Sequence, residues 1–295
     1  MIKGVTAGFL AYALFSSSDA CIKALGGTMS VFEILFLMTL VSFSTFGFAK
    51  PAEERWSEIF HMHRPHLVLL RAATGIGGGL LGAYAFTTLP LAEAYSLLFL
   101  MPAFATVLAI PVLGDRVGWR RGLAVLVGLA GVLLVVRPGF HQLHLGHLAA
   151  AFAAALGAAS LIVLRILGPT EKRISLLSTL YISVLIVDGT FMLASFTIPG
   201  PREIAIVIFA GLVGGFGQIA MLAATRQAPP NRVAPAQYSQ IVWAVVFGAA
   251  FFGELPDAVA FGGMALVVGS GLFTLLREEQ LYGWSRRTLL MRNRE

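Results

Sequence analysis

Four polar side chains recur at helical spacing on the first apolar stretch of the chain. Their intervals of four, three and four residues place them on one face of a helix: Tyr12, Ser16, Asp19 and Lys23. Hydroxyl, carboxylate and ammonium groups side by side can hold a small polar molecule through hydrogen bonds and charge. Two other interpretations stay open. Asp19 and Lys23 can form a purely structural ion pair, and the two hydroxyl residues can serve packing between helices.

Later apolar stretches carry a second set of amide, hydroxyl and aromatic groups. The candidate substrate-binding set takes Tyr12, Ser16 and Asp19 from the first stretch. Five residues of the later stretches complete it: Tyr84, Tyr95, Gln218, Gln237 and Trp243. The whole set suits a small zwitterion or a neutral polar metabolite, with an aromatic wall that tolerates apolar side chains. A multiply phosphorylated substrate would need clustered Arg or Lys among these groups, and the sequence has none there. For the two tyrosines the alternative is the aromatic belt at a membrane surface.

No arrangement of side chains indicates catalysis or a bound metal. The string 77–82 fits G-x-G-x-x-G, but no strand precedes it, and packing of small residues between helices explains it better than a nucleotide site. Two groups of histidines have spacings that a metal could use, but solvated positions at a membrane surface explain them better: His61, His63 and His66, then His141, His144 and His147. We therefore expect no enzyme activity, no cofactor and no metal.

The elements that position these residues are membrane helices. The chain is 57% hydrophobic and 12% charged, about half the charged share of a soluble domain, and its mean hydropathy is +0.82. Apolar runs of roughly 20 residues recur, each long enough to cross a hydrocarbon core of about 30 Å. We predict an all-α polytopic membrane protein with ten transmembrane helices, near 2–25, 30–49, 66–88, 90–113, 119–137, 144–167, 174–194, 202–225, 232–252 and 257–276.

Composition also limits the partners. The protein is expected to contact the lipid bilayer and a small-molecule substrate. The formal charge of +6 does not indicate a nucleic-acid partner, because the basic residues cluster between apolar stretches. The single cysteine, Cys21, excludes an internal disulfide and a thiolate zinc site.

The basic residues also predict the orientation of the helices. If the N-terminus is cytoplasmic, 18 of the 21 Lys and Arg residues fall on the cytoplasmic side, which favours both termini in the cytoplasm. In this topology Glu33, Glu93 and Asp188 lie in the outer parts of their helices. Glu33 and Glu93 suit interfacial or helix N-terminal positions. The role of Asp188 stays open.

A weak internal repeat connects the two halves of the chain. Residues 72–115 and 211–254 match at a fixed offset of 139, so that Gly78 falls on Gly217 and Pro90 on Pro229. Because each half holds five helices, the second must enter the membrane from the opposite side. Such inverted repeats around a central cavity are typical of secondary transporters.

The repeat sets the predicted domain boundaries. The first five-helix repeat spans 1–140, the second, inverted repeat spans 141–277, and a basic cytoplasmic tail spans 278–295. At the offset of 139, Tyr95 corresponds to Ala234 and Gln218 to Gly79. We therefore expect the two repeats to contribute unequal walls to one site.

Motifs inside the repeat resemble those of a known family. They are 83–86 (AYAF), 89–94 (LPLAEA), 102–104 (PAF) and 113–115 (LGD), then 228–229 (AP), 232–235 (RVAP) and 252–254 (FGE). On these residues the chain resembles the drug/metabolite transporter superfamily in its ten-helix EamA-type branch, over about 1–277. The resemblance implies a basket-like fold with a central cavity, which the fifth and tenth helices mainly support.

The same resemblance implies a transporter of small metabolites in the bacterial inner membrane. A bacterial exporter of aromatic and other amino acids is the closest fit, acting by alternating access. One alternative is a carrier of another metabolite, such as riboflavin or a nucleoside derivative. A passive channel is a further alternative, but the sequence shows neither rings of like residues nor a filter loop.

Overall fold

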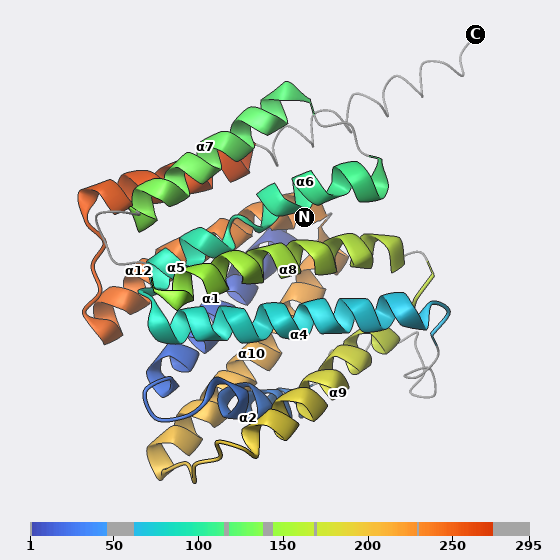
Figure 1. Cartoon of the computed structure of the whole chain (residues 1–295), viewed down its shortest axis with the longest axis vertical. Helices are drawn as coiled ribbons and strands as arrows, with labels where there is room; N and C mark the ends of the chain where they lie inside the picture. The colour runs from blue at the N-terminus through green and yellow to red at the C-terminus, as the bar shows by residue number, and fades with distance from the viewer. Residues whose placement is uncertain are drawn as a thin grey trace.

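The computed structural model describes residues 2–45, 62–114, 118–137, 144–167, 170–228 and 230–273. Within these ranges the chain is helical and contains no strand. The helices form one bundle, in which α4 and α8 run side by side and α2 lies next to α9 (Figure 1).

The first half of the bundle holds α1 (Ile2–Leu25), α2 (Val31–Phe43), α4 (Pro65–Thr88), α5 (Leu91–Leu98), α6 (Met101–Leu113) and α7 (Trp119–Val136). The second half holds α8 (Leu145–Leu167), α9 (Arg173–Met192), α10 (Pro201–Gln227), α11 (Pro230–Val233), η2 (Ala234–Tyr238), α12 (Ser239–Phe247), η3 (Gly248–Phe252) and a last helix, Ala258–Phe273. With α5 and α6 as one broken span and α11 to η3 as another, ten spans result within the described residues. The predicted ten-helix, all-α fold is confirmed.

Six of the described helical spans are long and apolar enough to cross a membrane, among them Leu91–Leu113, which joins α5 and α6. Their outer faces carry large exposed apolar side chains, such as Leu69 and Phe152, which are 58% and 62% exposed. In water such surfaces would favour association, whereas lipid solvates them.

The fourth and ninth spans are both interrupted, the fourth near its centre and the ninth in its first half. α5 ends at Leu98, and the chain resumes as α6 with Pro102 in its first turn, where the missing N–H costs little. In the ninth span Pro235 lies in the 3₁₀ segment η2. Phe99, at the first interruption, lies 5.2 Å from Tyr238, at the second, so the two interruptions meet inside the bundle.

Two helix pairs dominate the packing: α1 with α10, and α4 with α8. Glycine allows α1 and α10 to approach each other closely, because a Cβ on Gly217 of α10 would lie 2.7 Å from the Phe15 ring of α1. A shift of 139 residues carries α1 onto α8 and α4 onto α10. The α1–α10 pair therefore corresponds to the α8–α4 pair in the repeat. The shift also carries Gly114 onto Gly253, which end α6 and η3 with left-handed φ values of 71° and 67°.

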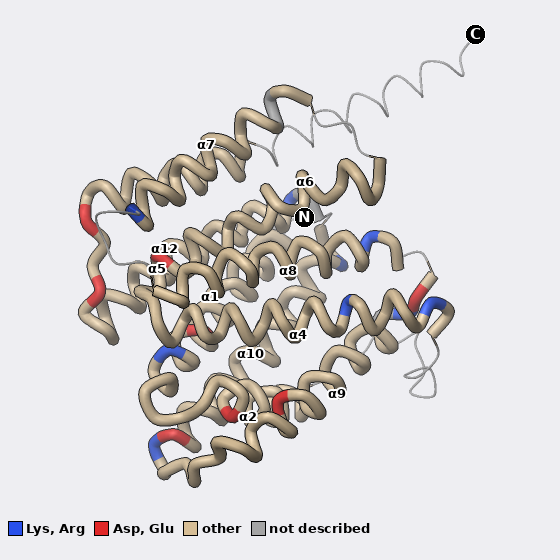
Figure 2. The backbone as a smooth tube through the Cα atoms, viewed as in Figure 1, with Lys and Arg blue, Asp and Glu red and all other residues tan. Residues whose placement is uncertain are grey.

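The charged side chains gather at two opposite ends of the bundle (Figure 2). We call them the Glu254 end, which also holds Lys23 and Arg137, and the Glu171 end, which also holds Arg64 and Arg71. At the Glu171 end the Arg64 backbone N–H donates to Glu171 Oε1 at 2.7 Å, and Arg71 donates to the carbonyl of Leu176 at 3.0 Å. The last helix and α7 pack together at one edge of the bundle through Gly131 and Gly263 (Figure 1).

Candidate functional site

A cavity of about 350 Å³ lies in the middle of the bundle, between the two interrupted spans. α4 contributes the bare backbone of Gly79, because glycine leaves space where any side chain would project. The polar and aromatic residues on its wall come from α1, α4, α5, the break after α5, η2 and α12: Asp19, Phe86, Tyr95, Phe99, Gln237 and Gln240. The cavity therefore lies where both halves of the chain meet.

The Tyr95 hydroxyl connects three helices on the cavity wall. Tyr95 is 3% exposed, and its hydroxyl donates a hydrogen bond to Asp19 Oδ2. The Tyr95 hydroxyl oxygen also lies 3.3 Å from Ser16 Oγ, and it accepts a hydrogen bond from Gln240 Nε2 at 3.3 Å. Because a phenol has one hydrogen and two lone pairs, these contacts satisfy it fully. A polar substrate can enter this group by exchanging one of these partners.

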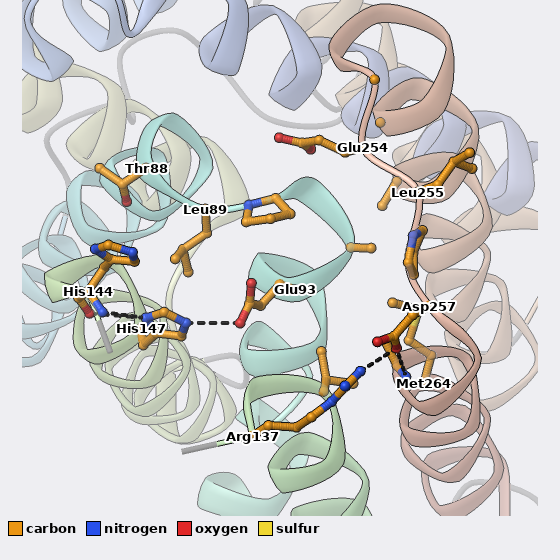
Figure 3. Close-up of a pocket in the computed structure, with 18 residues that line it drawn as sticks. Thr88, Leu89, Glu93, Arg137, His144, His147, Glu254, Leu255, Asp257 and Met264 are labelled. Carbon is orange, nitrogen blue, oxygen red and sulfur yellow. Dashed lines mark hydrogen bonds and ion pairs between the residues drawn. The ribbon is translucent and has the colours of Figure 1, made fainter. Parts of the chain in front are cut away.

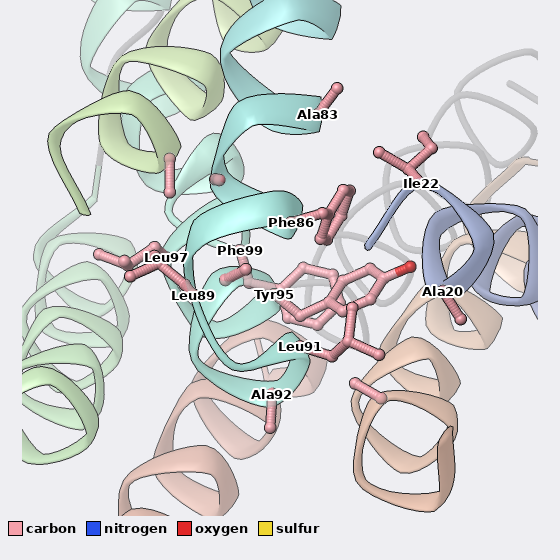
Figure 4. Close-up of a cluster of buried hydrophobic side chains, with 14 of the residues drawn as sticks. Ala20, Ile22, Ala83, Phe86, Leu89, Leu91, Ala92, Tyr95, Leu97 and Phe99 are labelled. Carbon is pink, nitrogen blue, oxygen red and sulfur yellow. The ribbon is translucent and has the colours of Figure 1, made fainter. Parts of the chain in front are cut away.

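Aromatic rings continue the wall on both sides of Tyr95. Its ring centroid lies 5.1 Å from that of Phe86 and 6.1 Å from that of Phe99, and Phe99 lies 5.2 Å from Tyr238 (Figure 4). Rings at these separations attract one another and offer an apolar surface to a planar or aliphatic group. The cavity thus combines one hydrogen-bonding wall with one aromatic wall.

The structure brings together half of the eight sequence-predicted site residues. Asp19, Tyr95 and Gln237 line the cavity, and Ser16 lies behind Tyr95. The other four lie elsewhere in the bundle. Gln218 is exposed, whereas Tyr12, Tyr84 and Trp243 are half-buried, and none of these four lines the cavity. Tyr12 packs edge-on against Phe15, and Trp243 stacks on Phe247.

Gln240 is the polar contributor that sequence reasoning left out of the site, as it also left out Phe86 and Phe99. It is 8% exposed, and it follows Gln237 by three residues, so both amides project from one side of the ninth span. That spacing is the signal which could have identified it. Gln218, by contrast, lies on α10, whose buried side faces α1 and α2.

Lys23 does not pair with Asp19. Its ammonium lies 2.7 Å from Glu254 Oε1 and donates to the Leu89 carbonyl at 2.5 Å. Glu254 Oε2 accepts from the Leu91 N–H at 3.1 Å. Asp19 already accepts a hydrogen bond from the Tyr95 hydroxyl. The left-handed turn at Gly253 places Glu254 next to the end of α1, where Lys23 lies. We call this contact the Lys23 clamp, because it fastens α1, the α4–α5 turn and the end of the ninth span.

A second cavity, of about 560 Å³, opens beyond the Lys23 clamp at the Glu254 end (Figure 3). Charged pairs line it: His147 Nε2 lies 2.9 Å from Glu93 Oε1, and Arg137 bonds Asp257. The bond from Arg137 lowers the pKa of the exposed Asp257 carboxyl, which also caps the last helix through the Ala260 N–H. We call this cavity the outer vestibule, because it lies outside the central cavity, toward the Glu254 end.

Two expectations, about His147 and Glu93, are corrected by the contacts in the outer vestibule. His147 is 7% exposed and bonded to Glu93, so it is not a solvated histidine. Glu93 is correspondingly an interhelix partner rather than only a favourable charge at the start of α5. His61 and His141 fall outside the described residues. Among the described residues no group of three His, Cys, Asp or Glu gathers as metal ligands would.

Comparison with known proteins places the fold and the class of activity. One solved crystal structure superposes with a TM-score of 0.67 at 18% identity, covering 94% of this chain and 98% of its own, which shows a shared fold. The S-adenosylmethionine uptake transporter of Rickettsia prowazekii is 23% identical over 95% of this chain and 94% of its own length. The pseudopaline exporter of Pseudomonas aeruginosa is 26% identical over 90% and 93%.

The expectation that the chain is no enzyme is confirmed, because these relatives are named as transporters of small molecules. The model of the EamA-like transporter family matches twice, at residues 2–137 and 144–276. The two matches together cover nearly all of the described helices. The chain therefore belongs to the EamA-like transporter family.

Proposed function

We propose that this protein is a secondary carrier that exports amino acids or closely related zwitterions across the bacterial inner membrane by alternating access. The observation that supports this substrate class best is the composition of the central cavity. Asp19 offers a negative charge to an ammonium group, and Gln237 and Gln240 offer amides to a carboxylate or carbonyl. Phe86 and Phe99 provide an apolar surface for the side chain of the substrate.

We further propose that residues 1–140 and 141–277 are inverted repeats, with both termini and the tail 278–295 in the cytoplasm. The exchange of the α1–α10 and α4–α8 pairs under one sequence shift supports this arrangement. The excess of Lys and Arg on the proposed cytoplasmic side supports the orientation, which makes the Glu254 end the outer one. Rocking of one repeat against the other would then open each end in turn.

In this scheme the Lys23 clamp closes the outer end. The pair is partly buried, with side-chain exposures of 11% and 25%, and it separates the central cavity from the outer vestibule. Opening must break the ion pair and two backbone contacts at once. Removing one partner leaves the other charge poorly compensated, which costs more than losing an exposed pair.

We therefore predict that Lys23→Met favours the outward-open state. The readout is a cysteine at Ala83, a buried residue on the cavity wall, in a Cys21→Ser background. A membrane-impermeant thiol reagent should label it at least tenfold faster in vesicles that expose the Glu254 end, and Glu254→Gln should act in the same direction. Faster labelling in both vesicle orientations would indicate general loosening of the fold, and unchanged labelling would make the clamp a static contact.

Substrate counterflow in proteoliposomes tests the carrier itself. Vesicles loaded with unlabelled phenylalanine, leucine, S-adenosylmethionine, riboflavin or a nucleoside are diluted into the labelled compound. A carrier exchanges a preferred compound with saturation, whereas a channel shows linear equilibration without counterflow. If no zwitterion competes while another compound does, the amino-acid assignment is wrong. Measuring net flux in both directions tests export.

A second substrate class is favoured by the aromatic wall. Three rings in sequence, Phe86, Tyr95 and Phe99, suit a planar heterocycle as well as an aromatic amino acid. Riboflavin and nucleoside derivatives belong to this class. Preference for a neutral heterocycle, undiminished in Asp19→Asn, would favour it over the zwitterion.

A further inference from the structure

One buried acid in the bundle takes no part in the central cavity or the outer vestibule. Asp188 lies near the end of α9, is 0% exposed, and neither of its carboxylate oxygens has a hydrogen-bond partner among the described residues. The other two buried acids among the described residues, Glu33 and Glu171, differ because each accepts a hydrogen bond. Glu33 accepts one from Thr197 at 3.1 Å and Glu171 accepts one from the Arg64 N–H at 2.7 Å, although one oxygen of each has no partner. An acid placed for structural reasons would be expected to make the hydrogen bonds that hold its neighbours, and Asp188 makes none.

Asp188 faces α2 across an aromatic contact. On α9 it shares a face with Tyr181, seven residues before it, and Phe191, three residues after it. Both of these rings meet rings of α2: Tyr181 lies 6.3 Å from Phe43, and Phe191 stacks on Phe32 at 5.2 Å. A Cβ on the adjacent Gly189 would lie 2.9 Å from the Phe36 ring. The carboxyl is therefore enclosed by apolar groups rather than by donors.

Glu33 belongs to the same part of this contact. It follows Phe32, the partner of Phe191, and precedes Phe36, the neighbour of Gly189, so Glu33 and Asp188 lie within about one helical turn of each other along the bundle. Glu33 lies in the first turn of α2, and Asp188 lies near the end of α9. Three carboxylate oxygens without partners thus lie around one interhelix contact.

No described cation neutralises Asp188. The titratable groups on the packed elements are Glu33 on α2, Tyr181 and Arg173 on α9, and His66, Arg71 and Tyr84 on α4. Arg71 bonds the carbonyl of Leu176, twelve residues from Asp188 and about 18 Å along the helix. A metal cation would need several further oxygen ligands, and no such group gathers among the described residues. A single proton is the cation that two carboxyls in an apolar contact can bind without other ligands.

We propose that Asp188, assisted by Glu33, is a proton-binding site that couples transport to a proton gradient. This inference rests on the proposed carrier function. The shift of 139 residues carries α2 onto the first part of α9, so the α2–α9 contact lies between the two proposed repeats. Any rocking of one repeat against the other changes this contact. Asp188 would hold its proton while the contact is closed and exchange it with water when the contact opens.

The test compares Asp188→Asn with wild type and with Glu203→Gln, which removes a partly exposed acid from the first turn of α10. Labelled phenylalanine is the probe in proteoliposomes. Asp188→Asn should keep counterflow at equal pH within about twofold and lose accumulation driven by an imposed pH gradient by more than tenfold. Glu203→Gln should keep both. Equal gradient-driven accumulation in Asp188→Asn and wild type, or accumulation driven by a sodium gradient instead, would overturn the proposal.

An infrared titration of the reconstituted protein gives a readout that needs no substrate. The carbonyl band of a protonated carboxylic acid should persist to neutral pH in wild type and be lost in Asp188→Asn. An unchanged band in Asp188→Asn would contradict proton binding there, even if phenylalanine transport is absent because the proposed substrate class is wrong. Should Asp188→Asn fail to fold, Glu33→Gln and Asp19→Asn are compared. A band that survives in both variants belongs to Asp188, and a band that disappears in one of them assigns the proton to that residue and overturns the proposal.

Discussion

Gly79→Leu is expected to stop transport of every substrate while leaving the fold intact. A Cβ on Gly79 meets nothing within 4 Å, because the residue faces the central cavity from α4. A leucine there extends into the space that a substrate needs, without displacing a neighbouring helix. We expect counterflow to fall more than tenfold for each compound of the panel, with an unchanged thermal unfolding transition.

Gly262→Leu is the matched control for this substitution. Gly262 is also a helical glycine with open space at its Cβ, but it lies on the outer face of the last helix, remote from the cavity. It should transport like wild type. Gly217→Leu should instead disturb the fold, because the Cβ alone would lie 2.7 Å from Phe15, and overpacking of this kind costs about 1–3 kcal/mol. Wild-type transport by Gly79→Leu would show that the substrate does not pass along this wall.

Tyr95→Phe is expected to weaken substrate binding about ten- to hundredfold. The substitution keeps the ring between Phe86 and Phe99 but removes the hydroxyl that bonds Asp19 and accepts from Gln240. A buried acceptor that loses its donor costs about 1–3 kcal/mol, and each 1.4 kcal/mol corresponds to tenfold in affinity. The measurement is the half-saturating concentration in counterflow, together with the maximal rate.

Tyr84→Phe removes the same hydroxyl from a residue of the same hairpin that does not line the cavity. Its half-saturating concentration should stay within twofold of wild type. If both variants lost affinity equally, the effect would come from the packing of the hairpin. If neither did, the Tyr95 hydroxyl would have only a structural role.

The sequence was sufficient for the features that depend on one helix at a time. Apolar runs of membrane length predict ten spans, because lipid forces each segment to satisfy its own backbone hydrogen bonds. Pro102 and Pro235 lie at the interruptions of the fourth and ninth spans, where the missing N–H donor of proline costs least. Helical periodicity placed Ser16 and Asp19 on one face, and both lie at the Tyr95 hydroxyl. The motifs of the repeat were enough to indicate the family.

Only the tertiary structure decided which of these faces meet. Periodicity gives the direction of a side chain around its own helix axis, but not which neighbouring helix lies in that direction. Asp19 is hydrogen-bonded to Tyr95, 76 residues away, and Lys23 is paired with Glu254. The sequence alone also allowed an ion pair between Asp19 and Lys23, because their spacing of four residues places them on one helical face. Tyr84 and Tyr95 looked alike in sequence, yet only Tyr95 lines the cavity, because the turn at Leu89 and Pro90 reverses the chain between them.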